Sequence, residues 1–411
     1  MRPRTALRAM MVAGIGLVGC NALIDVKDVF FDPNAAVPGS DGGADGAGGE
    51  GGTSAEAGVD SGPCMAELQT DPKHCGRCNH DCVGGTCTAG KCEPVLLAAG
   101  LGGPSAIALG KDHVYVTAYS ADAVLAVAKD GTGANVLVSS EERAHGVAVV
   151  GTTLYWANGD YPFDGTSYKG GIWQCSLPAC APATRRLIAA GNWPNYPIPR
   201  GNNLYFNESN NSAVVRAPID GGPTTLIAGT TQPYALAVDD VHAYYTSSQP
   251  KLYRAKLDGT SVVDGGVEEE VGPSAVGQGG VGFVAVDDQR VYWAFFEEAG
   301  KGHVQSVSKA SPAAGSVTYG TDADNVFPMG VVLDDKNVYW STCGSGTPAT
   351  PTGDGKVFAC PKAGCGAVPP VVLATGNVCA GQMAIDDVAI YWAEYGSISQ
   401  ASGRVRKVAK P

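Results

Sequence analysis

Apolar and polar positions alternate along this chain in a long-range repeat. Seven times, a short apolar run leads through a polar turn into a run of β-branched and aromatic residues that contains a tyrosine. These tyrosines are Tyr115, Tyr155, Tyr205, Tyr244, Tyr292, Tyr339 and Tyr391. Successive tyrosines are 40, 50, 39, 48, 47 and 52 residues apart. Because a repeat of 40 to 50 residues is typical of four-stranded units, the spacing indicates a repetitive all-β architecture.

Each repeat begins as a β-hairpin. In the repeat around Tyr244, the apolar residues 237–238 and the aromatic run 243–245 flank the polar turn Asp239–His242. Alternating β-branched and aromatic residues on either side of a short polar turn are a hairpin signature. Residues 355–360 and 370–376 supply a third and a fourth strand in the sixth repeat. The pattern therefore predicts an all-β, seven-bladed β-propeller.

The last repeat ends after three strands, at residues 404–408. A matching fourth strand lies at the other end of the repeat region, where residues 94–100 share Pro, Val, Leu, Ala and Gly with residues 370–376. An N-terminal strand that completes the last blade closes the ring and removes a sheet edge open to aggregation. We therefore expect the propeller to span residues 93–411.

Composition fits this fold and excludes some partners. The chain has 411 residues, 57 glycines and 26 prolines, which suits a β protein with many turns. A formal net charge of −12 argues against nucleic acid as a partner. The only glycine-rich nucleotide motif, at residues 277–282, precedes a strand instead of following one, so it predicts no nucleotide site. The sequence predicts no cofactor and no metal, and a monomer.

The N-terminus resembles a bacterial lipoprotein signal. Three arginines in the first eight residues precede an apolar run at residues 9–17, which is too short to span a bilayer. Residues 17–20, Leu-Val-Gly-Cys, resemble the lipobox. The resemblance implies that residues 1–19 are a signal peptide and that the thiol of Cys20 receives the lipid. With Asn21 next, the expected location is the cell envelope, at the outer membrane or the cell surface.

Two short segments separate the signal from the propeller. Residues 20–63 are rich in Gly, Ala and Asp, and their central part, residues 38–62, predicts a flexible tether that spans roughly 25–30 Å. Residues 64–92 contain six cysteines: Cys64, Cys75, Cys78, Cys82, Cys87 and Cys92. Residues 71–78 resemble the Asp-Pro-x-x-Cys-Gly-x-Cys element of myxobacterial surface proteins. We favour three disulfides there over a zinc site, with the connectivity open.

The other six cysteines lie in the propeller region. Cys175 with Cys180, and Cys360 with Cys365, have the same spacing at the same place in two repeats, between the third and fourth strands. Both are expected to be disulfides. Cys343 and Cys379 lie in loops of neighbouring blades that open on the same face, so we expect a third disulfide between them.

The tyrosine motif itself is interpreted as structural. Residues 338–341, Val-Tyr-Trp-Ser, resemble the Tyr-Trp-Thr-Asp repeat of seven-bladed propellers, in which the aromatic residues pack between blades. The paired aspartates that precede it, as at residues 239–240, are interpreted as turn and hydrogen-bond formers, not as metal ligands or acid/base groups.

The alternative to a binding domain is a propeller enzyme, either a lyase or a hydrolase, with its site at the mouth of the central channel. A resemblance to seven-bladed virginiamycin B lyase would imply a metal and a histidine base at the mouth of the central channel. Among the histidines of the propeller, only His145 lies at the start of an innermost strand, where it would face that mouth. No partner for it is evident in the sequence.

The loops expected on that face carry aromatic side chains beside polar ones, which suits stacking on sugars or holding an extended peptide. The candidate ligand-binding residues are His145, Tyr161, Phe163, Trp193, Tyr196, Tyr234, Phe283 and Gln382. We therefore expect a lipid-anchored envelope protein whose propeller is a non-catalytic binding or scaffolding domain for a protein or glycan.

Overall fold

A computed structural model shows the architecture of the chain. It describes residues 67–159, 170–230, 233–247, 251–260, 269–271, 279–297, 301–321, 323–345, 352–396 and 402–411. Cys20, Cys64, Tyr161 and Phe163 lie outside these ranges, as do the proposed signal and the whole of the proposed tether. The described part holds no helix with the length and apolarity that crossing a bilayer requires.

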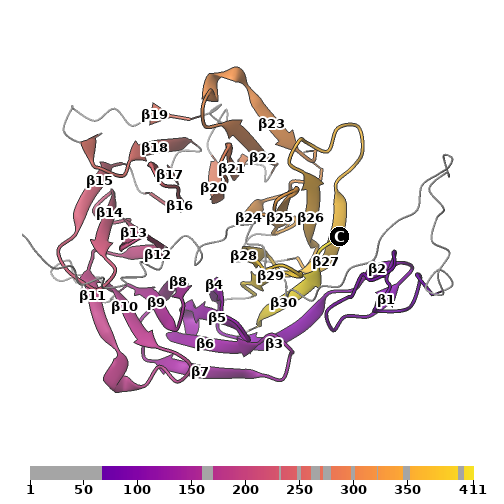
Figure 1. Cartoon of the computed structure of the whole chain (residues 1–411), viewed down its shortest axis with the longest axis horizontal. Coiled ribbons are helices and arrows are strands. Elements are labelled where there is room, and N and C mark those ends of the chain that lie inside the picture. Colours follow the sequence, from indigo (N-terminus) through magenta and orange to yellow (C-terminus); the bar gives the residue numbers. More distant parts are fainter. Residues whose placement is uncertain are drawn as a thin grey trace, which may run out of the picture.

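Seven four-stranded antiparallel sheets surround a central axis (Figure 1). The first blade consists of β4 (Pro104–Leu109), β5 (His113–Ala118), β6 (Ala123–Ala128) and β7 (Ala134–Ser139). The second consists of β8 (Ala144–Val150), β9 (Thr153–Asn158), β10 (Gly171–Ser176) and β11 (Arg186–Ala190). The third consists of β12 (Pro194–Arg200), β13 (Asn203–Glu208), β14 (Ala213–Pro218) and β15 (Thr225–Gly229).

The remaining blades repeat this order. The fourth consists of β16 (Leu236–Val238), β17 (His242–Thr246), β18 (Leu252–Lys256) and β19 (Glu269–Glu270). The fifth consists of β20 (Gly279–Val286), β21 (Arg290–Glu297), β22 (Gly302–Ser308) and β23 (Ser316–Tyr319). The sixth consists of β24 (Pro328–Leu333), β25 (Asn337–Thr342), β26 (Gly355–Pro361) and β27 (Val371–Asn377). Short 3-10 helices occupy Tyr119–Ala121 (η2), Pro182–Thr184 (η3) and Pro312–Ala314 (η4).

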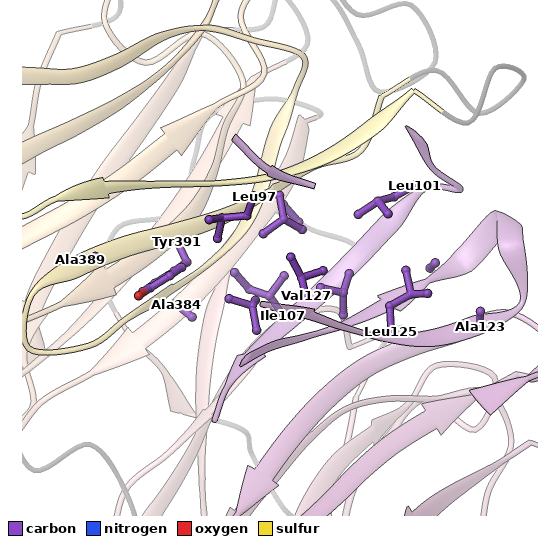
Figure 2. Packing of buried hydrophobic residues seen from close by; sticks show 14 residues of the cluster. Leu97, Leu101, Ile107, Ala123, Leu125, Val127, Ala384, Ala389 and Tyr391 are labelled. Atoms are coloured by element: carbon purple, nitrogen blue, oxygen red, sulfur yellow. The ribbon is translucent and has the colours of Figure 1, made fainter. Parts of the chain in front are cut away.

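The seventh blade combines both ends of the propeller. Its first three strands are β28 (Ala380–Ile385), β29 (Ala389–Glu394) and β30 (Gly403–Ala409), and its outer strand is β3 (Val95–Leu101). β3 pairs antiparallel with β30, with Val95 opposite Lys407. The seven-bladed fold and its closure by the N-terminal strand are therefore confirmed. Figure 2 shows Leu97 of β3 packed with Ile107 and Tyr391 in the core between the seventh and first blades.

The core lies between the blades. The four fully buried tryptophans are Trp156, Trp293, Trp340 and Trp392, and each follows a repeat tyrosine directly. Since each Trp and its Tyr point to opposite faces of one strand, they pack into neighbouring inter-blade clusters. This arrangement explains why the aromatic pair recurs in the sequence.

Irregularities in the ladders occur at both edges of the blades. The register shifts near the start of the innermost strand in six of the seven blades, all except the fourth. It shifts again in the outermost strand of the first, second, third, sixth and seventh blades. The outer bulges interrupt exposed edge strands and so limit pairing with other chains. The inner bulges turn side chains toward the axis.

The turn aspartates have the structural role predicted for them. In Asp239, Asp287, Asp334 and Asp386, one carboxylate oxygen accepts hydrogen bonds from backbone N–H groups two and three residues later. The other oxygen accepts one from the hydroxyl of the repeat tyrosine. A lysine of the next blade contacts each carboxylate, in the pairs Lys309–Asp239, Lys362–Asp287, Lys410–Asp334 and Lys129–Asp386. These ion pairs link adjacent blades at four of the seven blade interfaces.

The other three blade interfaces have uncharged or aliphatic residues in place of the Asp–Lys ion pair, except for Arg200 at one Asp position. Where the Asp position holds Gly110, Val150 or Arg200, the Lys position of the next blade holds Leu177, Ile219 or Leu257. Val150 and Ile219 pack in one apolar cluster. An acid therefore meets a lysine, and a non-acidic residue meets an aliphatic one, at every interface. This match avoids a half-buried lysine without a counter-charge.

Five disulfides join described cysteines. Cys175–Cys180, Cys360–Cys365 and Cys343–Cys379 are all present in the propeller, as predicted. In the N-terminal module, Cys75 pairs with Cys87 and Cys82 with Cys92, and Cys78 is also disulfide-bonded. Three module sulfurs, those of Cys75, Cys82 and Cys92, lie within 4.8 Å of one another, but all are in disulfides and cannot serve as thiolate metal ligands.

Candidate functional site

Aromatic side chains from several blades meet at the axis. The Tyr196 ring, at the bulge of β12, lies 5.1 Å from the His145 ring of β8 and 5.2 Å from the Phe283 ring of β20. Tyr234, which precedes β16, lies 6.2 Å from Tyr196 and 6.3 Å from Phe283. These residues belong to the second, third, fourth and fifth blades, so Tyr196 reaches past the neighbouring fourth blade to contact Phe283 of the fifth. We call His145, Tyr196, Tyr234 and Phe283 the axial aromatic cluster.

The local backbone explains how Tyr196 reaches this place. Its φ is +46°, a left-handed conformation that is uncommon for a non-glycine residue. The register shift between Asn195 and Ile198 falls at the same point, so the bulge redirects the side chain. Gly146 of the preceding blade has φ +70°, and a Cβ atom there would lie 2.4 Å from the Tyr196 backbone nitrogen. Glycine at position 146 is therefore required for the two innermost strands to approach this closely.

A second group extends the cluster toward the rim of the propeller. The Arg143 guanidinium lies over the Tyr119 ring at 5.7 Å and over the Trp193 ring at 5.4 Å. Tyr119 in turn lies 5.7 Å from His145, edge to face. The Arg143 backbone N–H donates to the Asp122 carboxylate. A continuous path of cation–ring and edge-to-face ring contacts therefore runs from Trp193 through Arg143 and Tyr119 to His145.

The rings of the axial aromatic cluster pack together and leave little of their surface open to a ligand. Tyr196 is buried, with 7% of its surface exposed, whereas Tyr234 is 38% exposed. His145, Phe283, Trp193 and Tyr119 are half-buried. Because Tyr196, Tyr234 and Phe283 pack against one another, a ligand would contact the outer surface of the group, chiefly Tyr234, Tyr119 and Trp193.

Burial sets the electrostatics of the site. Burial lowers the pKa of His145 to about 4, so its imidazole is neutral at pH 7. Its Nδ1 atom is buried and has no hydrogen-bond partner. Burial also raises the pKa of Tyr196, with a further contribution from the neighbouring Tyr234 hydroxyl. The site therefore presents neutral hydrogen-bonding groups and ring faces.

The charged groups nearby are already engaged. Glu141 accepts hydrogen bonds from the Trp156 indole and from the Asn158 amide, at 3.0 and 3.1 Å. Burial raises the pKa of the Glu141 carboxyl, and these hydrogen bonds offset part of that rise. Glu394 is fully buried and contacts Arg406 at 3.3 Å. Both carboxylates are therefore structural in this arrangement.

The structure brings some of the predicted ligand-binding residues together and places others elsewhere. His145, Tyr196, Tyr234 and Phe283 come together, and Trp193 joins them through Arg143. The Gln382 side-chain oxygen accepts a hydrogen bond from the Ile107 N–H at 2.7 Å, so it also links the seventh blade to the first. Tyr161 and Phe163 lie outside the described residues.

Sequence reasoning missed Tyr119, Arg143 and Tyr395. Burial raises the pKa of the half-buried Tyr395, which also interacts with the hydroxyls of Ser120, Tyr119 and Tyr234. A signal existed: Tyr119 and Tyr395 both lie four residues after a repeat tyrosine, Tyr115 and Tyr391. This offset places both side chains on the loops that follow the second strands, on the face that carries the axial aromatic cluster.

Comparisons with known proteins extend only to the fold. No protein-family model matches the sequence, and no curated protein matches it. The chain is similar in structure to the WD40 β-propeller domain of Doa1, with 12% identity, a TM-score of 0.52 and coverage of 77% of this chain and 97% of that domain. It is also similar to the computationally designed Ika8 protein (12%, 0.49, covering 76% and 98%) and to a chain of a nidogen/laminin complex (14%, 0.42, covering 59% and 87%). At such identities the likeness shows a β-propeller and no activity.

Proposed function

We propose that the propeller is a non-catalytic binding domain whose ligand rests on the axial aromatic cluster and on Tyr119 and Trp193 beside it. The observation that supports this most is the convergence of aromatic side chains from separate blades onto one face. Residues far apart in sequence, from His145 to Phe283, meet there through bulged strands. Aromatic rings with polar edges bind ligands by stacking and hydrogen bonding together.

The chemistry of the cluster favours binding over catalysis. A general base works best with a pKa near the operating pH, and His145, with a pKa of about 4, is a weak base at neutral pH. In the described residues, the one group of side chains close enough together to hold a metal consists of disulfide cysteines of the module. A lyase mechanism of the kind considered above would need a metal and a histidine base together.

The ligand class follows from the charges. Arg143 stacks between two rings, and Glu141 and Glu394 accept hydrogen bonds from neighbouring side chains. A platform of ring faces and neutral hydroxyl groups suits a neutral, hydroxyl-rich ligand. We therefore place a saccharide first and an extended uncharged peptide second.

The proposed setting is the cell envelope. Lipidation at Cys20 would hold the protein to the membrane, and the glycine-rich segment before residue 64 would serve as a tether. The ligand would then be a component of the cell surface or of the surrounding medium. The proposal implies a monomer that needs no cofactor.

The test uses arrays of neutral oligosaccharides and of peptides, probed with the mature chain and with a W193A/Y234A variant. Two stacking rings contribute about 1–3 kcal/mol together, so the variant should bind about 5- to 150-fold more weakly. His113→Ala, on the opposite face, is the matched control and should bind like the wild type. A variant that binds normally would refute the platform, and wild-type binding confined to peptides would reverse the order of ligand classes.

A further inference from the structure

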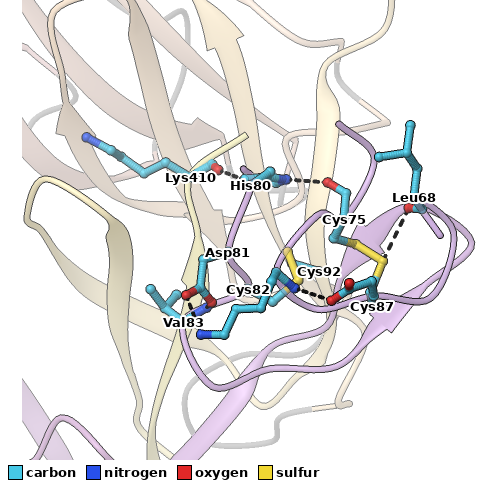
Figure 3. The surroundings of a disulfide bond; sticks show 11 residues. Leu68, Cys75, His80, Asp81, Cys82, Val83, Cys87, Cys92 and Lys410 are labelled. Carbon is cyan, nitrogen blue, oxygen red and sulfur yellow. Dashed lines mark hydrogen bonds and ion pairs between the residues drawn. A yellow bond between two sulfur atoms is a disulfide. The ribbon is translucent and has the colours of Figure 1, made fainter. Parts of the chain in front are cut away.

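The cysteine-rich module contacts the propeller through His80 and through Val83, which packs against the core between the seventh and first blades. The module contains β1 (Cys87–Thr88) and β2 (Lys91–Cys92) and lies beside the seventh blade (Figure 1). The His80 ring lies between two backbone carbonyl groups (Figure 3). Nε2 is 2.8 Å from the oxygen of Lys410 in the propeller, and Nδ1 is 2.5 Å from the oxygen of Cys75 in the module.

The Lys410 carbonyl belongs to a series that recurs in every blade. In each blade, the residue after the third strand donates its N–H to the turn between the first and second strands. The series is Lys129, Leu177, Ile219, Leu257, Lys309, Lys362 and Lys410. In four cases a side chain of the preceding blade donates to the carbonyl oxygen: Arg216 to Leu257, Arg254 to Lys309, Tyr319 to Lys362 and Lys407 to Lys129. These hydrogen bonds join adjacent blades.

The sixth blade lacks a donor for Lys410. Arg216, Arg254 and Lys407 all lie three residues before the member of the series in their own blade, and the sixth blade has Ala359 there. Ala359 has no side-chain donor. His80 of the module approaches the same carbonyl oxygen instead. The module therefore supplies, at this interface, a donor of the kind that the third, fourth and seventh blades supply from their third strands.

The geometry also constrains the proton count of His80. A backbone carbonyl oxygen only accepts, and a neutral imidazole carries one N–H donor and one acceptor nitrogen. Only the imidazolium form donates to Cys75 and Lys410 together. In the neutral form, one ring nitrogen would face a carbonyl oxygen with lone pair against lone pair, which weakens the contact.

We propose that His80 is a proton-dependent contact between the cysteine-rich module and the propeller. The docked module favours the imidazolium, so docking is strongest at acidic pH. It weakens as the pH rises through the range in which histidines lose their charge, between about pH 5 and 8. The module stays attached by the chain through β3, and what changes is how firmly it is held against the seventh blade.

Other charges around His80 also affect how firmly the module docks on the seventh blade. In the module, Asp81 pairs with Lys73 at 2.7 Å, and this bond, with one from the Val83 N–H, lowers the pKa of Asp81. From the propeller, Lys407 of β30 interacts with Asp81 and with Lys129, Asp130 and Asp386, whereas Lys410 contributes its carbonyl oxygen and directs its ammonium group to Asp334. The pKa values of the Asp81 and Asp130 carboxyls are lowered, so both stay charged at acidic and neutral pH and favour the imidazolium, whereas the lysines oppose it. The pH response therefore originates at His80.

Hydrogen exchange of the mature full-length chain tests the proposal. Backbone amides of residues 74–92 and 403–410 are followed by mass spectrometry at pH 5.5, 6.5 and 7.5, with rates corrected for intrinsic exchange. We expect protection of these segments to fall by up to about tenfold per pH unit once His80 is neutral. Protection of a distant blade, such as β20 to β23, should stay constant.

Two variants give the control. His80→Gln should show weaker protection at pH 5.5 and no pH dependence. His74→Gln, in the same module, should behave like the wild type, because the Nδ1 of His74 accepts a single hydrogen bond from the Asn79 N–H. Constant wild-type protection from pH 5.5 to 7.5 would overturn the proposal even if a variant fails to fold. An unchanged pH response in His80→Gln would also overturn it.

Discussion

The ion pair between Lys309 and Asp239 gives a sharp test of how the blades are joined. Lys309→Met removes the charge and keeps most of the aliphatic stem. Asp239→Asn removes the partner charge and keeps the shape. Together with the double variant D239N/K309M, these substitutions form a double-mutant cycle for one blade interface.

The structure sets the expected magnitudes. Without Lys309, Asp239 keeps hydrogen bonds from two backbone N–H groups at 2.8 and 2.7 Å and from Tyr244 at 3.0 Å. Without the Asp239 charge, Lys309 still donates one hydrogen bond to the Asp287 carbonyl oxygen at 2.9 Å. With side-chain exposures of 21% and 14%, the pair is partly screened. We expect a loss of about 1.5–2 kcal/mol of unfolding free energy for each single variant and a coupling of about 1 kcal/mol.

The assay is chemical unfolding at pH 7, followed by tryptophan fluorescence with matched incubation times, because large proteins often unfold irreversibly. The control is Lys336→Met, which removes an exposed lysine of the equivalent turn in the sixth blade and should change stability by less than about 0.5 kcal/mol. The chain already contains an uncharged version of this interface at Val150 and Ile219. The double variant should therefore lose less than the sum of the single variants.

Two results would contradict this reasoning. A Lys309→Met variant as stable as Lys336→Met would mean that the ion pair adds nothing to the interface. A coupling within about 0.3 kcal/mol of zero would mean that the two residues act independently. In either case, the replacement of Lys by an aliphatic residue wherever the Asp position is not acidic would need a different explanation.

Three further predictions concern closure, anchoring and acid stability. Deletion of residues 93–100 should leave the seventh blade with three strands, and the variant should aggregate or melt without cooperativity; a monomer with an unchanged midpoint would refute the closure role of β3. Cys20→Ser should release the protein from membranes or leave its signal uncleaved, because serine cannot form the thioether; normal membrane fractionation would remove the lipoprotein proposal. Burial raises the pKa values of Asp239, Asp287, Asp334 and Asp386, but hydrogen bonds from lysine or tyrosine side chains and from backbone N–H groups outweigh it and leave them low. Their stabilisation should be complete above about pH 4 and lost as the pH falls through the lowered pKa values, and unfolding midpoints between pH 5 and 2.5 that do not fall would contradict it.

The sequence was most informative where the structure repeats. The tyrosine spacing predicted the blades, because every unit must place one aromatic strand in the same environment. The match between residues 94–100 and 370–376 predicted the closing strand for the same reason. The equal spacing of Cys175 with Cys180 and of Cys360 with Cys365 predicted two disulfides that bridge equivalent turns.

The site was harder to predict, because it depends on irregular backbone. Residues at the starts of innermost strands were expected near the axis, and His145, Tyr196, Tyr234 and Phe283 meet there. The bulge that brings Tyr196 into contact with His145 and Phe283 has φ +46° at a tyrosine, a conformation that sequence patterns do not indicate. The contact of Arg143 with both Tyr119 and Trp193 joins loops of the first three blades and has no periodic signal.

Closure of the ring by β3 also has a consequence for the order of folding. Val95 pairs with Lys407, so the partners are separated by 407 − 95 = 312 residues. Closing a loop of this length in the unfolded chain costs about 5 kcal/mol of conformational entropy from its length alone. β3 therefore pairs with β30 only after the intervening blades have formed and brought the two ends together. During synthesis from the N-terminus, β3 is among the first strands made and the last to find its partner. The first strand of the propeller therefore waits, unpaired, for the final strand of the last blade.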